Sequence, residues 1–437
     1  MMHSNYDGVN TRFLRVDERL IVSEETEMPL VIEPKGASDV AFLQTFLASN
    51  STQILADIAK YGAVLLRGFD ITSEEAFENT LLSIQGFRGI SDAFMSEEGR
   101  DHVGNLKYVL HTNSVYKTGG TVYLGGFHSE NYYSADVPSY ICFCCLRPSD
   151  IGGETGLIHM QKIYEHLDAA LQKKLEKNPF FVSKWLVSDV AERYKISNEA
   201  VEKLCAHFQL PIVGKGLDKF VLMYKPSVFL HPETKKKSLQ INLFELPTLN
   251  AEMRKCFMQD YQGKPWFWHR FVWQLPESIM SILEFFYIIV ASFIHSPIEA
   301  LKIARSKWRA FKAVHKKNNL PAFNDVKVGS CFDEDQVKEL AKLIRNYYSS
   351  CLWKQGDILL VDNRQVMHAG MPGSGKRLLR VVIGNPIEMN YTSSDPAVIE
   401  CNNRTTDTVG SYARTYPLPD LDPVISHGLK PRKSSKA

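Results

Sequence analysis

The strongest constraint on the fold is a helical, aromatic-rich block at residues 250–350, which separates two β-rich parts of the sequence. Before it, residues 108–158 form short runs of strand-forming residues broken by Gly, Pro, Asn and Asp. After it, residues 356–384 form two strand-like runs around a Gly- and Pro-rich loop. A chain of 437 residues can hold one large domain with insertions. We therefore expect a mainly β fold with flanking helices and a large helical insertion.

A series of strand, helix, strand and helix is predicted at the start of the chain. Residues 28–34 are typical of a strand, and residues 40–61 carry apolar side chains at helical spacing until Gly62 ends the pattern. The run "AVLLRGFD" predicts a strand, and "TSEEAFENTLLSI" predicts a helix with a Thr/Ser cap and an acidic first turn. Further on, residues 219–246 resemble a hairpin whose charged turn is "HPETKKK".

Charge and cysteine content narrow the class of protein. The chain has 51 Lys and Arg against 49 Asp and Glu, without a basic stripe, and this balance argues against nucleic acid as a partner. Eight cysteines are too few for a disulfide scaffold, and residues 1–20 lack the apolar core of a signal peptide. We expect a cytoplasmic protein whose tail, from residue 427 onward, is disordered.

Residues 278–294 form a long apolar stretch that bears on membrane contact. The stretch has seventeen residues, at the bottom of the spanning range, and Glu284 interrupts it. Length and charge favour a buried or interfacial helix over a membrane span. Contact with a membrane surface through this stretch is an alternative that we do not favour at this point.

The segment "GGFHSENYY" places His128 and Glu130 two positions apart. In an extended segment such residues face the same side, so both can bind one metal ion. A distant third ligand would give the arrangement of two histidines and one carboxylate that binds non-haem Fe(II). His368, at a strand end before a Gly-rich loop, can supply that ligand. Three open positions would then remain for a bidentate co-substrate and dioxygen.

An α-keto acid co-substrate has a far carboxylate that must also be held. A guanidinium group on the following strand suits this task because it binds a carboxylate with two parallel hydrogen bonds. Arg377 and Arg380 follow His368 by nine and twelve residues. Either arginine can take this role on spacing alone.

Four motifs in this order resemble the taurine dioxygenase/TfdA-like family of Fe(II)- and 2-oxoglutarate-dependent oxygenases. They are "VLLRGFD", "FHSENYYSADVP", "IGGETGL" and "GDILLVDNRQVMHAG" followed by "KRLLR". The glutamate in the second motif resembles the branch that includes clavaminate synthase-like enzymes and amino-acid or peptidyl-carrier-bound hydroxylases of secondary metabolism. The resemblance spans residues from about 28 to about 390.

The resemblance implies a set of site residues. His128, Glu130 and His368 correspond to the iron ligands, and Thr155 to the threonine that binds the 2-oxoglutarate carboxylate. Arg377 is the expected partner of that carboxylate, with Arg380 as the alternative. The residues that follow the metal pair, which could face the substrate or simply pack in the core, are Asn131, Tyr132 and Tyr133.

The resemblance also implies a distorted jelly roll, a double-stranded β-helix of two packed sheets. The expected parts are an N-terminal extension (1–25), a catalytic domain (26–249 and 351–398), a helical insertion (250–350) and a C-terminal extension with a disordered tail (399–437). The insertion carries Trp266, Trp268 and Trp273, which would either line a lid over the substrate or dock the insertion onto the barrel.

The function implied is hydroxylation of an unactivated C–H bond with Fe(II), 2-oxoglutarate and O2, releasing succinate and CO2, with desaturation as a variant. The substrate would be a small molecule or an amino-acid-like group tethered to a carrier protein. Because Glu130 occupies the position where related halogenases have a small residue, oxygenation is expected. The alternatives are a membrane-surface oxygenase acting on a lipid chain and a non-catalytic jelly-roll binding protein.

Other residues have interpretations that the sequence leaves open or favours weakly. Asp362 and Asn363 could orient the metal ligands or form an ordinary turn. The run "CFCC" alternates as a buried strand does, and no second Cys pair lies at zinc-finger spacing. His159 and His166 are expected to be ordinary core or surface residues.

Overall fold

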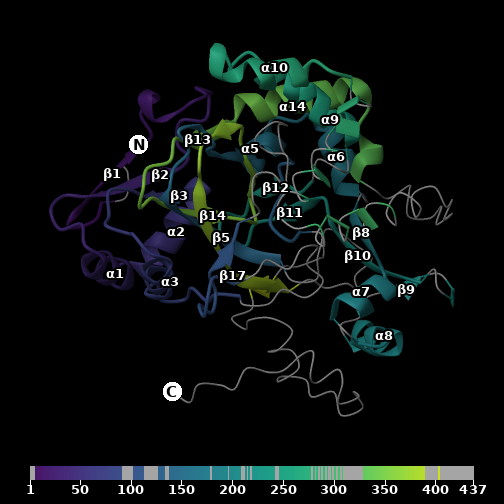
Figure 1. The fold of residues 1–437 in the computed structure, drawn as a ribbon, viewed down its shortest axis with the longest axis horizontal. Helices are drawn as coiled ribbons and strands as arrows, with labels where there is room; N and C mark the ends of the chain where they lie inside the picture. Colours follow the sequence, from purple (N-terminus) through teal and green to yellow (C-terminus); the bar gives the residue numbers. More distant parts are fainter. Residues whose placement is uncertain are drawn as a thin grey trace.

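A computed structural model gives the fold of the chain. It describes residues 5–90, 102–112, 126–132, 137–177, 180–194, 196–207, 212–213, 215–216, 219–241, 246–276, 328–388 and 402–403, with single residues between 279 and 308. Two β-sheets pack face to face, and helices cover their outer faces (Figure 1). This is the jelly-roll core that the sequence predicts, with helices around it.

The larger sheet joins both β-rich parts of the chain. Its strands, in the order in which they pair, are β1 (Val9–Phe13), β2 (Leu30–Pro34), β3 (Ala63–Leu66), β14 (Ile358–Asp362), β5 (Val137–Arg147), β17 (Leu378–Glu388) and β18 (Asn402–Asn403), and β4 (Leu110–His111) also pairs with β17. All pairs are antiparallel except β2 with β3. Strand β14, from beyond the helical block, thus lies between β3 and β5 from before it.

The smaller sheet has the order β13 (Tyr348–Cys351), β7 (Thr155–His159) and β15 (Val366–Gly370). Both outer strands pair antiparallel with β7, and His368 lies opposite Leu157. The neighbouring strands β6 (Ile151–Gly152) and β16 (Gly373–Ser374) pair with one another. Two strands from the C-terminal part therefore flank one strand from the N-terminal part.

Alternation along the strands builds three apolar layers. In β5, Ile141, Phe143 and Cys145 face the core between the two sheets, while Cys142 and Cys144 face the helices. Every second residue of a strand points to the same face, so a continuous apolar run such as "YICFCCL" must be covered on both sides. This explains why β5 is buried along nearly its whole length.

Three helices cover the outer face of the larger sheet: α1 (Val40–Ser49), α2 (Ser51–Tyr61) and α3 (Glu74–Leu82). The prediction of one helix over residues 40–61 is wrong, because the chain breaks at Asn50. There Asn50 Nδ2 donates to the Phe46 carbonyl and Ser51 Oγ donates to the Leu47 carbonyl, at 2.8 and 2.7 Å. These side chains satisfy the last carbonyls of α1 and so end the helix.

The outer face of the smaller sheet is covered by a second group of helices, on the opposite side of the molecule from α1–α3 (Figure 1). These helices are α5 (Met160–Glu165), α6 (Ala169–Lys177), α9 (Pro247–Phe257), α10 (Phe267–Trp273) and α14 (Glu334–Asn346). Trp266 and Trp273 are buried in this layer, whereas Trp268 is 69% exposed. Two of the three tryptophans therefore dock the helical block onto the core.

A further part of the chain lies beside the two sheets. It contains β8 (Phe180–Leu186), α7 (Val187–Tyr194), α8 (Asn198–His207), β9 (Ile212–Val213) and β10 (Phe220–Pro226), followed by β11 (Val228–Leu230) and β12 (Lys237–Leu239). The predicted hairpin is β11–β12, with "HPETKK" as its turn. Strand β10, which the sequence places in that hairpin, pairs instead with β8 and β9.

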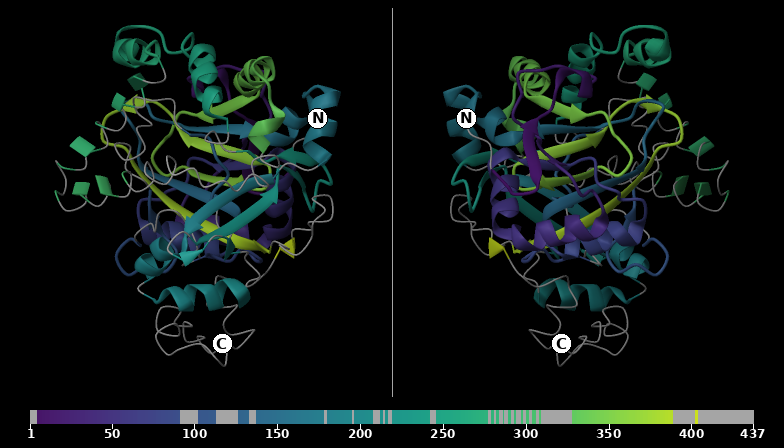
Figure 2. Two further views of the ribbon diagram at one scale, coloured as in Figure 1. Left: turned by 90° about the vertical axis from the view of Figure 1, so that its right-hand side faces the viewer. Right: turned by 90° about the vertical axis from the view of Figure 1, so that its left-hand side faces the viewer.

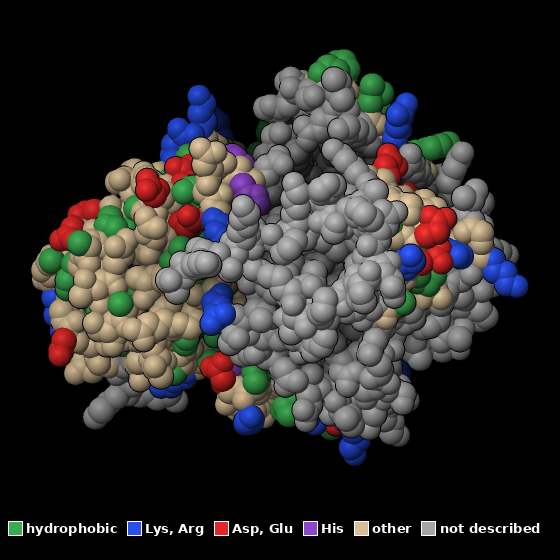
Figure 3. Space-filling model, turned by 90° about the horizontal axis from the view of Figure 1, so that it is seen from below, with side chains coloured by type: hydrophobic (Ala, Val, Ile, Leu, Met, Phe, Trp, Pro, Cys, Tyr) green, Lys and Arg blue, Asp and Glu red, His purple; other side chains and the backbone are tan. Residues whose placement is uncertain are grey.

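The surface charge and the helices of the described residues can be compared with what the composition predicts. On the face seen in Figure 3, the acidic and basic side chains of the described residues are interspersed without a continuous basic patch. Among the described residues, no helix has both the length and the apolar character needed to cross a membrane. Most of residues 278–294 and of the C-terminal extension lie outside the described residues.

Candidate metal centre

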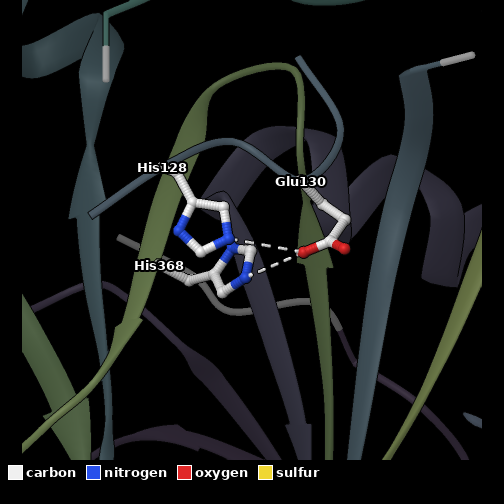
Figure 4. A group of neighbouring side chains, drawn as sticks. All are labelled: His128, Glu130 and His368. Carbon is white, nitrogen blue, oxygen red and sulfur yellow. Dashed lines mark ion pairs between the residues drawn. The ribbon is translucent and has the colours of Figure 1, made fainter. Parts of the chain in front are cut away.

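His128, Glu130 and His368 lie together inside the jelly roll, although 238 residues separate Glu130 from His368 in the sequence. Glu130 Oε2 is 3.5 Å from Nε2 of each histidine, and one ligand atom from each residue lies within 4.8 Å of the other two (Figure 4). Neighbouring ligands on an octahedral ion are about 3 Å apart. The three side chains thus fit one metal ion after a small inward movement.

The backbone brings the two histidines together. The N–H of His128 donates to the carbonyl of His368 at 3.1 Å, and the N–H of His368 donates back to the carbonyl of His128 at 3.0 Å. This isolated antiparallel bridge fixes the register of the loop that carries His128 and Glu130 against β15. The ring centroids of the two histidines are 4.6 Å apart.

A backbone carbonyl selects the tautomer of His128. Its Nδ1 lies 2.8 Å from the carbonyl oxygen of Gly126, which can only accept a hydrogen bond. Nδ1 therefore carries a proton, and Nε2 is the nitrogen that faces Glu130. A histidine whose Nδ1–H is held by a carbonyl presents Nε2 to a metal ion.

Asn363 holds the main chain of the carboxylate ligand. Its Oδ1 accepts from the Glu130 N–H at 2.6 Å, and its Nδ2 donates to the carbonyls of Glu130 and Pro138 at 3.0 and 2.8 Å. Of the two interpretations left open by the sequence, Asn363 thus supports the candidate site. Asp362, the last residue of β14, instead accepts hydrogen bonds from His231 and Arg364. All three side chains are buried.

Gln240 supports the loop from a second direction. Its Oε1 accepts from Ser129 Oγ at 2.9 Å, and its Nε2 donates to the Arg364 carbonyl at 2.7 Å. Gln240 directly follows β12, so the β11–β12 hairpin braces the segment between the first two candidate ligands. No sequence pattern predicts this contact, since a Gln at a strand end can form hydrogen bonds with many other partners.

Thr155 lies on the same face of the smaller sheet as His368. In the pairing of β7 with β15, Thr155 lies opposite Gly370, and Leu157 lies opposite His368. Opposite residues share a face, and so do residues two apart on one strand, so all four point to one side. Leu157 belongs to the core between the sheets, which makes this the inner face. Thr155 is buried.

Arg377 reaches the same region. Its Nη1 donates to the carbonyl of Gly153 at 2.5 Å, and its Nη2 would be 3.6 Å from a Cβ built on Gly370. Because Gly370 lies opposite Thr155, the guanidinium group is next to the inner face that carries Thr155 and His368. Burial lowers the pKa of Arg377, while the charge of Glu154 raises it.

Arg380 points to the other side of the larger sheet. Its Nε and Nη2 lie 3.0 and 2.9 Å from Glu74 Oε1, in the first turn of α3. Arg380 lies opposite Cys144 of β5, whose side chain faces the helices, so Arg380 faces the same way. Arg380 thus has a structural partner outside the candidate site.

The two described residues that follow Glu130, Asn131 and Tyr132, are buried. Asn131 has a φ of 53°, in the left-handed region that Asn tolerates, where the chain turns after Glu130. Asn131 and Tyr132 are 4% and 3% exposed. Tyr133 lies outside the described residues. A contact of these side chains with substrate stays a prediction.

Glu154, which the sequence analysis did not single out, is fully buried beside Thr155. Its Oε1 is 3.5 Å from the hydroxyl of Tyr348, and the charge of Arg377 acts on its carboxylate. Burial raises the pKa of Glu154 to about 7. The signal was present in the "GGET" motif, but burial of a carboxylate cannot be read from a motif.

The remaining histidine and cysteine predictions hold. Cys142, Cys144 and Cys145 are buried in β5, as core packing requires. His159 is buried, and burial lowers its pKa to about 3, so it is neutral. The Nε2 atom of His166 and the hydroxyl of Tyr347 are hydrogen-bonded at 2.7 Å, away from the metal group.

A comparison with protein families gives a match for the chain. The sequence model described as "Taurine catabolism dioxygenase TauD, TfdA family" matches residues 31–265. No curated protein matches the chain significantly.

Solved structures with similar folds were also found. A taurine dioxygenase from Burkholderia xenovorans is 12% identical, with a TM-score of 0.40, covering 90% of this chain and 99% of its own. PvcB, an Fe, alpha-ketoglutarate dependent oxygenase from an isonitrile synthetic pathway, is 11% identical, with a TM-score of 0.43 and coverage of 88% and 93%. AAD-2, solved with Mn(II) and N-oxalylglycine, is 12% identical, with a TM-score of 0.40 and coverage of 86% and 97%.

The family match covers more than half of the chain and begins at the first central strand of the larger sheet. Within it lie the His128 and Glu130 pair and the "GGET" motif, and β15 brings His368 to them. The predicted family, enzyme class and cofactors are confirmed: the chain belongs to the TauD/TfdA family and is an oxidoreductase, a dioxygenase that uses Fe(II), 2-oxoglutarate and O2.

Proposed function

We propose that this dioxygenase hydroxylates an unactivated C–H bond of a small or carrier-tethered, amino-acid-like substrate, with release of succinate and CO2. The observation that carries the proposal is one inner face with His368, Thr155 and the Arg377 guanidinium, against which His128 and Glu130 pack. Iron ligands and a carboxylate-binding group are thereby neighbours.

In this proposal, His128, Glu130 and His368 hold the iron through Nε2, a carboxylate oxygen and Nε2. Iron with bound 2-oxoglutarate and O2 supplies an oxidant able to break an unactivated C–H bond. Arg377 binds the far carboxylate of 2-oxoglutarate with two parallel hydrogen bonds, and Thr155 donates its hydroxyl to the same carboxylate. Arg377 already donates to Gly153, so little side-chain freedom is lost when the co-substrate binds.

The exposure of the ligands indicates the route of the substrate. The His128 side chain is 30% exposed, whereas the side chains of Glu130 and His368 are each 5% exposed. Substrate therefore approaches from the side of His128, and the β7–β15 side stays closed to water. Glu130 fills the position at which a halogenase would need room for a halide, which supports oxygenation.

We propose that the helical block is an insertion over residues 250–350. It contacts the loop next to the proposed 2-oxoglutarate site. Trp266 packs so closely on the loop before Thr155 that a Cβ on Gly152 would lie 2.6 Å from its ring. The adjacent Gly153 accepts the hydrogen bond of Arg377. We infer that the insertion fixes this loop, and that Trp266 and Trp273 serve in docking.

The metal test uses Fe(II) and 2-oxoglutarate without oxygen, which together give a weak visible charge-transfer band when both bind one site. We expect the wild type to show the band, and His128→Ala and His368→Ala to lose it. His166→Ala, a histidine away from the metal group, is the matched control and should keep it. A band that persists in either ligand variant would refute the ligand assignment.

The substrate test follows succinate release with amino acids, peptides and carrier-bound aminoacyl groups. Stimulation by a carrier-bound amino acid over the free amino acid would support tethering. Absence of stimulated succinate release with every one of these substrates would refute the proposed substrate class. Mass spectrometry of the product, for a gain of one oxygen or a loss of two hydrogens, separates hydroxylation from desaturation.

A further inference from the structure

Exposed large apolar side chains gather in one part of the chain. Of the sixteen such side chains among the described residues, eleven fall between positions 267 and 308. They are Phe267, Trp268, Phe271, Ile279, Ile282, Leu283, Phe286, Val290, Phe293, Leu301 and Trp308. Soluble proteins rarely expose so many large apolar groups together, and such clusters mark contact surfaces.

The order of these residues follows a helix. Every described residue between 279 and 308 is helical. The six exposed apolar residues from Ile279 to Phe293 follow one another at intervals of one, three or four residues, the spacing found along one face of a helix. Met280 is only 3% exposed and faces the protein. These described residues therefore turn apolar side chains outward, the reverse of an ordinary surface helix.

Helix α10 adds aromatic and basic groups on the same side of the molecule. In both views of Figure 2, the described pieces of residues 279–308 lie at the outer edge, away from the sheets, on the side capped by α10. A surface groove of about 420 Å³ runs along α10 and is lined by Gly263, Lys264, Phe267, Arg270, Phe271 and Gln274. Two cations thus flank two exposed phenylalanines.

Charge is concentrated in this stretch. Residues 264–317 contain nine Lys and Arg and three Asp and Glu, a net charge of +6 within a chain whose total is +2. The rest of the chain is therefore negative, at −4. An apolar stripe with Trp and Phe beside Lys and Arg is the composition of helices that lie in the plane of an anionic membrane surface. A symmetric contact between two copies would place these like charges against one another, which argues against a second copy as the occupant.

We propose that α10 and the six exposed apolar residues Ile279, Ile282, Leu283, Phe286, Val290 and Phe293 form a docking surface for an anionic lipid bilayer. The aromatic and aliphatic side chains enter the interface between headgroups and acyl chains, and Lys264 and Arg270 pair with lipid phosphates. This docking goes beyond the proposed reaction and does not depend on the iron. Contact with a membrane surface, which the sequence alone does not favour, becomes the preferred interpretation because the described apolar side chains of this stretch point away from the core.

The test is co-sedimentation of the full-length protein with vesicles of phosphatidylcholine alone or mixed with phosphatidylglycerol. We expect binding to the mixed vesicles that weakens as salt is raised. Two double variants, Trp268→Asp with Phe271→Asp and Phe286→Asp with Val290→Asp, should each lower the ratio of bound to free protein about tenfold or more. The matched control is Val22→Asp with Leu230→Asp, exposed apolar residues elsewhere, which should bind as the wild type does.

A charge variant separates the two parts of the surface. Lys264→Gln with Arg270→Gln should lower binding to anionic vesicles and leave binding to neutral ones unchanged. Absence of wild-type binding to anionic vesicles, or equal loss in the control, would overturn the proposal. Self-association that the same aspartates abolish, without vesicle binding, would show an interface between copies instead.

Measuring the charge-transfer band in the same proteins separates the test of vesicle docking from the test of the proposed reaction. All docking variants should retain the band, which also shows that they are folded. If the wild type binds vesicles but gives no band, the iron assignment fails and the docking surface stands. If the band is present and no vesicles bind, only the docking surface is refuted.

Discussion

The Asn363 side-chain amide binds the peptide groups on both sides of Glu130, because its Oδ1 accepts from the Glu130 N–H and its Nδ2 donates to the Glu130 carbonyl. A residue just after β14 thereby sets the position of a carboxylate 233 residues earlier in the chain. The direction in which Glu130 Oε2 points depends on this contact.

Asn363→Ala should weaken metal binding about 10- to 100-fold, since ligands lose precision when the groups that orient them are removed. Anaerobic titration with Fe(II), or with Mn(II) followed by calorimetry, measures the change. Asn385→Ala is the matched control, because Asn385 clamps the Gly86–Arg88 loop in the same way, away from the metal group. Equal metal affinity in the wild type and Asn363→Ala would contradict the assigned role.

Arg377→Met should weaken 2-oxoglutarate binding about a hundredfold, which corresponds to about 3 kcal/mol for a lost pair of charge-assisted hydrogen bonds. Titration of the charge-transfer band with 2-oxoglutarate gives the dissociation constant. Arg380→Met removes the ion pair with Glu74 and should leave this constant unchanged. The assignment fails if Arg380→Met has the larger effect.

Glu154 should make the stability of the metal-free protein depend on pH. Burial raises its pKa to about 7, from an ordinary value of 4.5. Between these values the folded state binds more protons than the unfolded state, so the free energy of unfolding falls as pH rises toward 7. Glu154→Gln cannot ionise, and should exceed the wild type in stability by up to about 3 kcal/mol above about pH 8, but only slightly near pH 5.

Urea unfolding of both proteins at the two pH values measures this difference. Glu75→Gln, at an exposed position in α3, is the control and should shift neither value. A stability gap between Glu154→Gln and the wild type that stays constant with pH would show that Glu154 is not ionising in this range.

Arg67 in "VLLRGFD" should matter for stability. Its Nε and Nη2 lie 3.0 and 2.6 Å from the two carboxylate oxygens of Asp357, and both side chains are buried. Arg67→Met leaves that carboxylate uncompensated and should cost about 3–5 kcal/mol of unfolding free energy. Arg67→Met with Asp357→Leu should recover most of the loss. Denaturant unfolding tests this, and equal losses in the single and double variants would contradict the pairing.

Several short-range signals in the sequence were reliable, although the break at Asn50 was not predicted. Ser73 caps α3 by accepting from the Ala76 N–H, as the Thr/Ser and acidic pattern predicted, and Gly62 ends α2 with a φ of 77°. The jelly roll, the enzyme class and the cofactors could also be predicted, because four motifs appear in the order that the family requires. Such features depend on neighbouring residues or on motif order alone.

Features that depend on pairing across long distances could not be predicted. The choice between Arg377 and Arg380 needs the register of β17, which contains an irregularity between Leu378 and Leu379. Strand β13 has the sequence "YSSC", which is too short and polar to be recognised without its partner β7. Which arginine binds 2-oxoglutarate stays a prediction, although Arg380 already pairs with Glu74.

The reciprocal bridge between His128 and His368 has a consequence for the order of events during translation. His128 and Glu130 leave the ribosome first, and at about 5–20 residues per second His368 follows roughly 12–50 seconds later. A nascent chain that ends before β15 holds at most two of the three side chains. Binding of iron by all three side chains can thus begin only after β15 has been made, and it reports that both halves of the barrel have closed.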